Sequence, residues 1–181
     1  MKIKIPFADD VIEKLRAGDR VELTGAIYVA RDAAHKRLVD ALDGGKPLPI
    51  DVKGQVVYYM GPSPTKPGRV IGSAGPTTSG RMDSYAPRLM EIGLKGMIGK
   101  GLRAKPVKEA MKKYKAVYFA ATGGAAALIA QSIMKAQVVA YEDIGAEAIL
   151  KLEVEDFPVI VVNDIHGGDA YEDGKAQYAR K

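Results

Sequence analysis

The chain contains one loop, Gly72-Ser73-Ala74-Gly75-Pro76-Thr77-Thr78-Ser79-Gly80-Arg81-Met82-Asp83, that combines the features of an anion-binding site. Its glycines let backbone amides approach a ligand, and Pro76 stiffens the turn beside them. Thr77 and Thr78 offer hydroxyl groups, and Arg81 offers a fork of donors that matches a carboxylate. The segment leads into a predicted helix N-terminus, which also favours anions. The alternative is a flexible connector whose Ser and Thr residues only satisfy turn amides.

On both sides of this loop, short apolar segments alternate with amphipathic ones. The apolar runs predict strands, and the segments with one apolar face predict helices. Asp9 and Asp10 are expected to cap the first helix and Ser84 a later one. The predicted strands are 21–29, 56–60, one near Met97, 116–121, 137–141 and 159–162; the predicted helices are one near Asp9, then 34–42, 84–93, one from Pro106, 124–134 and 146–150. This alternation indicates an α/β domain with a mixed sheet.

Length and composition set limits on the class of protein. The chain has 181 residues, 47% of them hydrophobic, which suits a single domain over residues 1–181. It has no cysteine, so a disulfide framework is excluded. The start Met1-Lys2-Ile3-Lys4 lacks the apolar run of a secretory signal, and no segment is apolar for long enough to span a bilayer. We therefore expect a cytoplasmic protein with no membrane partner, and a polar, loosely ordered tail over about 165–181.

The net charge of +5 raises the question of nucleic-acid binding. The densest basic cluster, Lys105–Lys115, has an apolar stripe at i, i+3, i+4 and i+7, formed by Val107, Ala110, Met111 and Tyr114. This spacing predicts a helix with lysines on its solvated face. Aromatic residues are not interleaved with basic ones as base stacking requires. We therefore expect no nucleic-acid partner.

Other short motifs do not support nucleotide or metal chemistry. Gly99-Lys100-Gly101 lacks the upstream glycine and the following Ser or Thr of a phosphate-binding P-loop. The turn Thr122–Ala126 lacks dinucleotide-binding glycine spacing, and its small residues favour close packing of a helix on a sheet. His35 and His166 are far apart and have no matching ligands, so no metal site is expected. His35 is expected at the surface of a helix start.

Several stretches resemble the iron–sulfur hydro-lyases of the class I fumarase and L-tartrate dehydratase family, in its C-terminal or beta-subunit portion. The resemblance runs in order along nearly the whole chain, and the loop Gly75–Tyr85 is its most specific part. The other matching stretches are Thr24–His35, Gly96–Gly101, Tyr118–Ala127 and Leu152–Pro158. The resemblance implies a swivelling β/β/α sandwich as the fold.

It also implies reversible loss of water from a 2-hydroxy dicarboxylic acid. In that family a four-iron, four-sulfur cluster binds the departing hydroxyl, and cysteine thiolates hold the cluster. Because this chain has no cysteine, it is expected to be the beta subunit of a two-subunit enzyme. The alpha subunit is then the partner that carries the cluster, and the enzyme is expected to be a homo-oligomer of alpha/beta pairs.

The family motifs place five site residues on this sequence. Thr77 falls on the proposed proton-abstracting base, while Thr78, Arg31, Arg81 and Lys100 fall on residues that bind the substrate. The simpler alternatives are a strand-end salt bridge for Arg31, a loop counter-ion for Arg81 and a solubilising charge for Lys100.

A threonine is a poor base unless its neighbours shift its proton affinity. Asp83 or a carboxylate of the partner is therefore an alternative proton acceptor. The first functional hypothesis is a fumarate hydratase of the tricarboxylic acid cycle, interconverting fumarate and (S)-malate. L(+)-tartrate dehydratase is the nearest alternative, and a non-catalytic anion-binding or regulatory module is the alternative from another class.

Overall fold

The computed structural model describes residues 1–121 and 125–179. The expected strand-to-helix turn at Thr122, Gly123 and Gly124 lies outside the described residues. The strands are β1 (Lys2–Lys4), β2 (Arg20–Val29), β3 (Val56–Tyr58), β4 (Gly96–Gly99), β5 (Val117–Ala120), β6 (Ile133–Ala140) and β7 (Ile149–Asn163). The helices are α1 (Asp9–Ile12), α2 (Asp32–Asp43), α3 (Ala86–Glu91), α4 (Lys105–Tyr114), α5 (Ala126–Ile129) and α6 (Ala170–Tyr178), with short 3₁₀ helices η1 (Ser79–Met82), η2 (Ala130–Ser132) and η3 (Glu142–Glu147).

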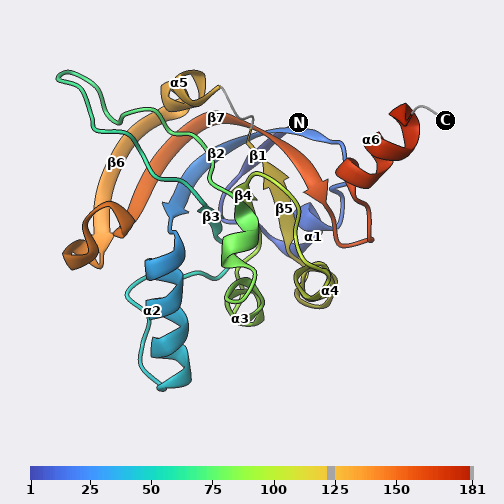
Figure 1. Cartoon of the computed structure of the whole chain (residues 1–181), viewed down its shortest axis with the longest axis horizontal. Coiled ribbons are helices and arrows are strands. Elements are labelled where there is room, and N and C mark those ends of the chain that lie inside the picture. The colour runs from blue at the N-terminus through green and yellow to red at the C-terminus, as the bar shows by residue number, and fades with distance from the viewer. Residues whose placement is uncertain (122–124, 180–181) are drawn as a thin grey trace.

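These strands form one mixed sheet in the order β1-β2-β3-β4-β5-β7-β6. Strands β1 to β5 run parallel to one another, whereas β7 runs antiparallel to its neighbours β2, β5 and β6. Because β7 pairs with β2 as well as with β5, the long strands β2 and β7 fold over the parallel part of the sheet. Figure 1 shows these long strands arching above the short parallel ones.

The parallel strands supply side chains to two separate cores. Val56 and Tyr58 belong to the core between the parallel strands and the β2–β7 arch, and Val57 and Tyr59 belong to the core beneath the helices. This division follows from the alternation of side chains across a strand. Helices α2, α3 and α4 lie together on one side of the sheet, and α5 lies on the other side (Figure 1). The expected α/β class with β/β/α layering is confirmed.

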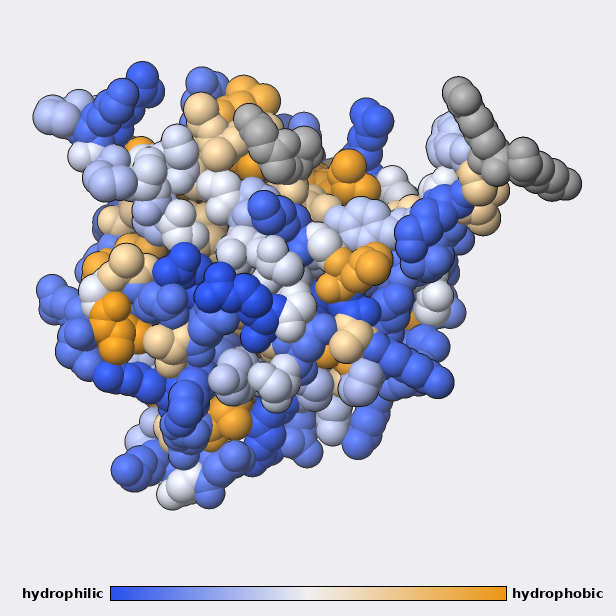
Figure 2. All heavy atoms as spheres, in the orientation of Figure 1, coloured by the Kyte–Doolittle hydropathy of each residue, from blue (hydrophilic) through white to orange (hydrophobic). Residues whose placement is uncertain are grey.

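Helix α4 forms where the apolar stripe predicts it. Val107 and Met111 are fully buried, Ala110 is 8% exposed, and the lysines of the helix face solvent. In the orientation of Figure 1, hydrophilic residues cover most of the surface and hydrophobic ones appear in small separate groups (Figure 2). The basic residues of α4 thus belong to a solvated helix face.

The C-terminal third of the chain differs from the sequence prediction. The expected helix at 124–134 is only the four-residue α5 followed by η2, and the segment expected as a helix at 146–150 contains the end of η3 and the start of β7. Strand β7 is far longer than the predicted strand at 159–162. Charged residues in Glu153–Asp156 and the proline Pro158 interrupt its apolar pattern, and Asp156 has a positive φ of 49° at a register shift opposite β2. A bulge of this kind hides a strand from pattern analysis.

Two other expectations are wrong. The described part of the tail is not loosely ordered, because Asp169 caps α6 by accepting hydrogen bonds from the backbone N–H groups of Tyr171 and Glu172. The N-cap positions of α1 and α3 are Ala8 and Tyr85, with no side-chain cap, so the predicted aspartate and serine caps are not used. In the described part of the chain, no helix combines the length and apolar character needed to cross a membrane.

Candidate functional site

The threonine–arginine loop is held against the carboxyl ends of the parallel strands. The Thr77 N–H donates to the Tyr59 carbonyl at 2.7 Å, just beyond the end of β3. The Lys100 N–H donates to the Thr77 carbonyl at 3.2 Å, and the Ser79 N–H donates to the Lys100 carbonyl at 2.9 Å. These bonds set Thr78 opposite Lys100 as a parallel bridge. The loop residues Thr77 and Thr78 therefore lie beside Lys100, which follows β4 and is distant from them in sequence.

A buried hydroxyl pair supports the loop from below. The Ser79 Oγ lies 2.9 Å from the Tyr118 hydroxyl, which donates to the Gly101 carbonyl at 2.9 Å. A carbonyl only accepts, so the proton of Tyr118 goes to Gly101 and Ser79 donates to Tyr118. Gly99 makes room for this pair, since a Cβ at that position would lie 2.0 Å from the Ser79 Oγ.

Arg81 extends from η1 toward the start of α2. Its Nε donates to Asp32 Oδ1 at 2.9 Å, and its Nη2 lies 2.8 Å from Asp32 Oδ2. The Arg81 side chain is 52% exposed. The Arg81 guanidinium thus faces the Asp32 carboxylate with its Nε and Nη2 atoms, while part of the side chain remains open to solvent.

Arg31 immediately follows β2 and packs beside the same helix start. Its Nη2 lies 3.0 Å from Glu147 Oε1, while Glu147 Oε2 accepts from the Ala33 N–H at 2.7 Å. The Arg31 guanidinium also lies against Gly61, where a Cβ would come within 2.6 Å of Nη1. Its Nε is buried and has no hydrogen-bond partner among the described residues. The buried Nε–H of Arg31 is therefore a donor that no described residue uses.

Contacts along this edge of the sheet connect the five predicted site residues. Asp32 links Arg81 to the helix start that follows Arg31, and the backbone bonds link Lys100 to Thr77 and Thr78. Thr77 is half-buried, whereas Thr78 and Lys100 are exposed. Within residues 1–121 and 125–179, the Lys100 ammonium has no carboxylate within ion-pair distance. The ion pairs of Arg31 and Arg81 are those that the simpler interpretation of these residues predicts, and their role in substrate binding stays a prediction.

Arg103 lies behind the loop and sequence reasoning missed it. It is 3% exposed, and its guanidinium sits between the rings of Tyr59 and Tyr118, at 5.4 and 5.0 Å from their centroids. Its Nε donates to Asp83 Oδ1 at 2.6 Å, and Asp83 Oδ2 accepts from the Ala104 N–H at 2.7 Å. Both oxygens of Asp83 are thus engaged, which disfavours Asp83 as proton acceptor. In the sequence, the only sign of a role for Arg103 was its position three residues after Lys100.

His35 is fully buried, contrary to the expected surface position. Its Nδ1 lies 2.8 Å from the Arg31 carbonyl, and its ring packs on Tyr59 at a centroid distance of 5.3 Å. A carbonyl only accepts, so Nδ1 carries the proton in the neutral ring. Burial lowers the pKa of His35 to about 4. His35 is therefore a neutral core residue that supports the backbone at Arg31.

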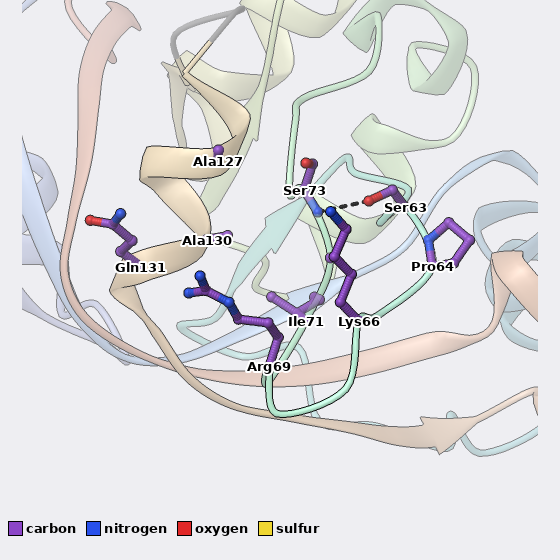
Figure 3. Close-up of a pocket in the computed structure, with 10 residues that line it drawn as sticks. Ser63, Pro64, Lys66, Arg69, Ile71, Ser73, Ala127, Ala130 and Gln131 are labelled. Carbon is purple, nitrogen blue, oxygen red and sulfur yellow. Dashed lines mark hydrogen bonds between the residues drawn. The ribbon is translucent and has the colours of Figure 1, made fainter.

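A separate groove lies between the proline-rich loop and α5. Its volume is about 250 Å³, and its lining includes Ser63, Lys66, Arg69, Ala130 and Gln131. Figure 3 shows Lys66 and Arg69 reaching across it from the loop, and Ser63 Oγ accepting from the Ser73 N–H. None of the five predicted site residues lines this groove. This groove is therefore separate from the candidate site.

Comparison with known proteins gives a consistent result. The model of the family described as Fumarase C-terminus matches residues 1–174. This chain belongs to that family. It is 45% identical over 155 residues to "Fumarate hydratase class I, anaerobic" of Escherichia coli (strain K12) and 44% identical over 156 residues to "Fumarate hydratase 2" of Leishmania major, covering 84% and 85% of this chain. It spans only 28% of the length of each of these relatives.

A third relative has a similar length to this chain. It is "Putative L(+)-tartrate dehydratase subunit beta" of Methanocaldococcus jannaschii, 38% identical over 168 residues that cover 90% of this chain and 86% of the relative. The expected resemblance to the class I fumarase and tartrate dehydratase family is therefore confirmed.

The residues of this chain do not fit an iron–sulfur cluster. Such clusters need thiolate ligands, and the sequence has no cysteine. Groups of three or more His, Asp or Glu side chains suitable for a metal ion are also absent from the described residues. A cluster would therefore need ligands from outside this sequence.

Proposed function

We propose that this chain is the beta subunit of a two-subunit hydro-lyase that interconverts fumarate and (S)-malate. The proposal rests on contacts along the carboxyl ends of β2, β3 and β4, where Thr78 is bridged to Lys100 and Arg81 is paired with Asp32, the residue after Arg31. Open α/β sheets bind ligands at this edge. The similarity to the E. coli and Leishmania fumarate hydratases supports the choice of reaction.

The three cations suit a dicarboxylate. Removing a proton from the carbon beside a carboxylate builds up negative charge on that carboxylate. Cations that face it therefore stabilise the transition state more than the ground state. In this conformation the Arg81 guanidinium pairs with the Asp32 carboxylate, and the Arg31 guanidinium pairs with the Glu147 carboxylate. Each guanidinium is therefore oriented to bind a carboxylate. Within the described residues the exposed ammonium of Lys100 has no ion pair, so it is available to a ligand.

In this proposal Arg31, Arg81, Thr78 and Lys100 bind and orient the dicarboxylate, and Thr77 takes part in proton transfer. The four-iron, four-sulfur cluster belongs to the alpha subunit and supplies the site that receives the hydroxyl. The absence of cysteine here and the beta-subunit name of the similarly sized relative support this division. The enzyme is proposed to act in the cytoplasm as an oligomer of alpha/beta pairs.

Reconstitution tests the proposal. The chain is purified alone and then mixed anaerobically with the cysteine-bearing protein of an adjacent reading frame. The chain alone should show no hydratase activity, and the mixture should hydrate fumarate and show the brown absorbance of a cluster. Robust activity from the metal-free chain alone contradicts the proposal, and an inactive brown complex favours the non-catalytic anion-binding module.

Tartrate dehydration is the second candidate, because the relative of similar length carries that name. The two substrates differ by one hydroxyl group. The same reconstituted complex, assayed in parallel with malate and L(+)-tartrate, distinguishes them by the ratio of kcat/KM values.

A further inference from the structure

A second connection joins the two segments that carry Thr77 and Lys100. One end of each segment is joined by the backbone bonds from Lys100 to Thr77 and from Ser79 to Lys100. The other end is joined by Asp83, whose oxygens accept from Arg103 and from the Ala104 N–H. The segments 77–83 and 100–104 are therefore tied together at both ends.

The Arg103 end of this connection is built as a rigid unit. The Arg103 side chain is fully buried, and the Asp83 side chain is 16% exposed. A buried arginine held by a carboxylate and stacked between two aromatic rings has little freedom to move. Burial opposes the charge of Arg103, but the neighbouring Tyr59 and Asp83 outweigh burial and raise its pKa. The guanidinium therefore stays charged.

The tyrosine on one face of Arg103 also contacts the loop. Tyr118 stacks on the guanidinium, and its hydroxyl joins Ser79 to Gly101. Burial raises the pKa of Tyr118, so this hydroxyl keeps the proton that it donates. Arg103 is thus connected to the residues next to Thr78 and Lys100 without lying at the surface where a substrate binds.

We infer that Arg103, together with Asp83, is a positioning residue that fixes Lys100 relative to the Thr77–Thr78 pair. The inference rests on the proposed function for its effect on catalysis, but its structural part is independent of it. Without the Arg103–Asp83 pair, the second attachment of the segment 100–104 is reduced to the bond from the Ala104 N–H to Asp83. The Lys100 ammonium then samples positions that a reacting dicarboxylate does not use, and misplacement of about 1 Å is enough to slow a reaction ~100-fold.

The first test measures amide hydrogen exchange by NMR on the full chain. Arg103→Lys keeps a cation but loses the planar fork, and Arg103→Met removes the charge. In both variants the Lys100 and Ser79 amides should exchange at least ~10-fold faster. The amides of Ile5 and Val161, which donate to the Thr24 and Asp19 carbonyls in and just before β2, should keep their protection.

A matched control is Lys108→Met on α4. Lys108 forms a partly buried ion pair with Asp169, 2.5 Å long, that does not involve the loop. This variant should leave exchange at Lys100 and Ser79 unchanged. If Arg103→Met does not fold, Arg103→Lys decides. Unchanged protection at Lys100 and Ser79, or equal loss of protection at Ile5 and Val161, overturns the inference.

The second test uses steady-state kinetics of the reconstituted complex. Arg103→Lys should lower kcat by at least ~10-fold while KM changes less than threefold, because the cations still bind the substrate but are not held for the transition state. Wild-type kcat in this variant contradicts the positioning role. An inactive wild-type complex contradicts the proposed function instead, and the exchange result then stands by itself.

Discussion

Thr77 and Thr78 are neighbours in sequence but differ in environment. The half-buried Thr77 is fixed through its backbone N–H to Tyr59, whereas Thr78 is exposed opposite Lys100. A residue that transfers a proton needs a fixed position more than a residue that only contacts the substrate. The difference favours Thr77 for the chemical step and Thr78 for binding.

The Thr77→Val variant separates these roles. Valine keeps the branched shape and the backbone bond and removes only the hydroxyl. If Thr77 transfers the proton, turnover of the reconstituted complex should fall by at least ~100-fold with a modest change in KM. Thr78→Val should mainly raise KM. Wild-type turnover in Thr77→Val would move the proton acceptor to the partner chain, since both oxygens of Asp83 are engaged.

His35 predicts a pH dependence of folding. The unfolded chain binds a proton at His35 near pH 6.5, whereas the folded chain does so only near pH 4, because burial lowers the pKa. Between these values the unfolded state holds more protons, so the free energy of unfolding falls as the pH is lowered through this window. The full loss is on the order of 3 kcal/mol.

Urea unfolding at pH 7 and pH 4.5 measures this effect. The wild type and the control His166→Gln, whose histidine is exposed, should both lose stability between these pH values. His35→Gln should be less stable at pH 7 but change much less with pH. Asp164 contributes to the pH dependence only at lower pH. Burial disfavours ionisation of Asp164, but the backbone N–H groups that it accepts from outweigh burial and lower its pKa below 3.8. An equal pH dependence in His35→Gln contradicts the assignment.

At the scale of elements, η3 is fastened to α2 by two ion pairs of different burial. Glu147 pairs with Arg31, both side chains being less than 25% exposed, and it accepts from the Ala33 N–H in the first turn of α2. Asp143 pairs with Arg37 and is 63% exposed. Glu147 therefore satisfies a backbone N–H group in the first turn of α2, as a capping side chain does, although it is distant in sequence. Asp143 does not.

These two residues give a matched pair of variants. Glu147→Ala should lower the free energy of unfolding by about 1–2 kcal/mol, because it leaves Arg31 and a helix N–H without their partner. Asp143→Ala should have a much smaller effect, because exposed ion pairs contribute little. Urea titrations of both variants provide the measurement. A larger loss for Asp143→Ala would show that η3 is not held through Glu147.

Elements were predictable from sequence where one face alone is buried. The stripe Val107–Met111 marked α4, and the apolar run of β2 matched Arg20–Val29, because their buried positions follow one period. Strand β7 was not predictable, because its bulge at Asp156 and its pairing with three other strands depend on long-range contacts. The capping of α6 by Asp169 was not predictable either, because a side chain can be recognised as a helix cap only when the backbone is known.

The candidate site divides in a similar way. The resemblance of the loop supplied Thr77, Arg81 and their companions. The fold connects them along one edge of the sheet, and their roles stay a prediction. Arg103 and the burial of His35 were missed, since a cation or imidazole in a polar sequence is usually exposed. The internal carboxylates Asp32 and Glu147 were also invisible, because their pairing joins residues 49 and 116 positions apart. A site depends on such distant contacts more than a helix does.

At the scale of the whole molecule, the internal carboxylates determine how strongly the isolated chain binds a ligand. A dicarboxylate has to compete with Asp32 for Arg81 and with Glu147 for Arg31. We therefore expect weak binding of malate to the chain alone, and a stabilisation that appears only at high ligand concentration. A ligand at 100 times its Kd stabilises the folded state by about 2.7 kcal/mol.

For a chain of this length, such stabilisation raises the midpoint of thermal unfolding by about 5 to 10 °C. Thermal unfolding with increasing malate, at ionic strength held constant with NaCl, measures the rise, and lactate serves as the monocarboxylate control. Arg81→Ala and Arg31→Ala should each lose most of it, because a charge-assisted pair contributes about 1.5–3 kcal/mol. Arg88→Ala should retain the rise in the midpoint. Arg88 lies on α3, and its ion pairs are with Asp43 and Glu91. An equal rise with lactate, or a full rise in Arg81→Ala, would mean that malate acts as a general anion and that these arginines do not form a dicarboxylate site.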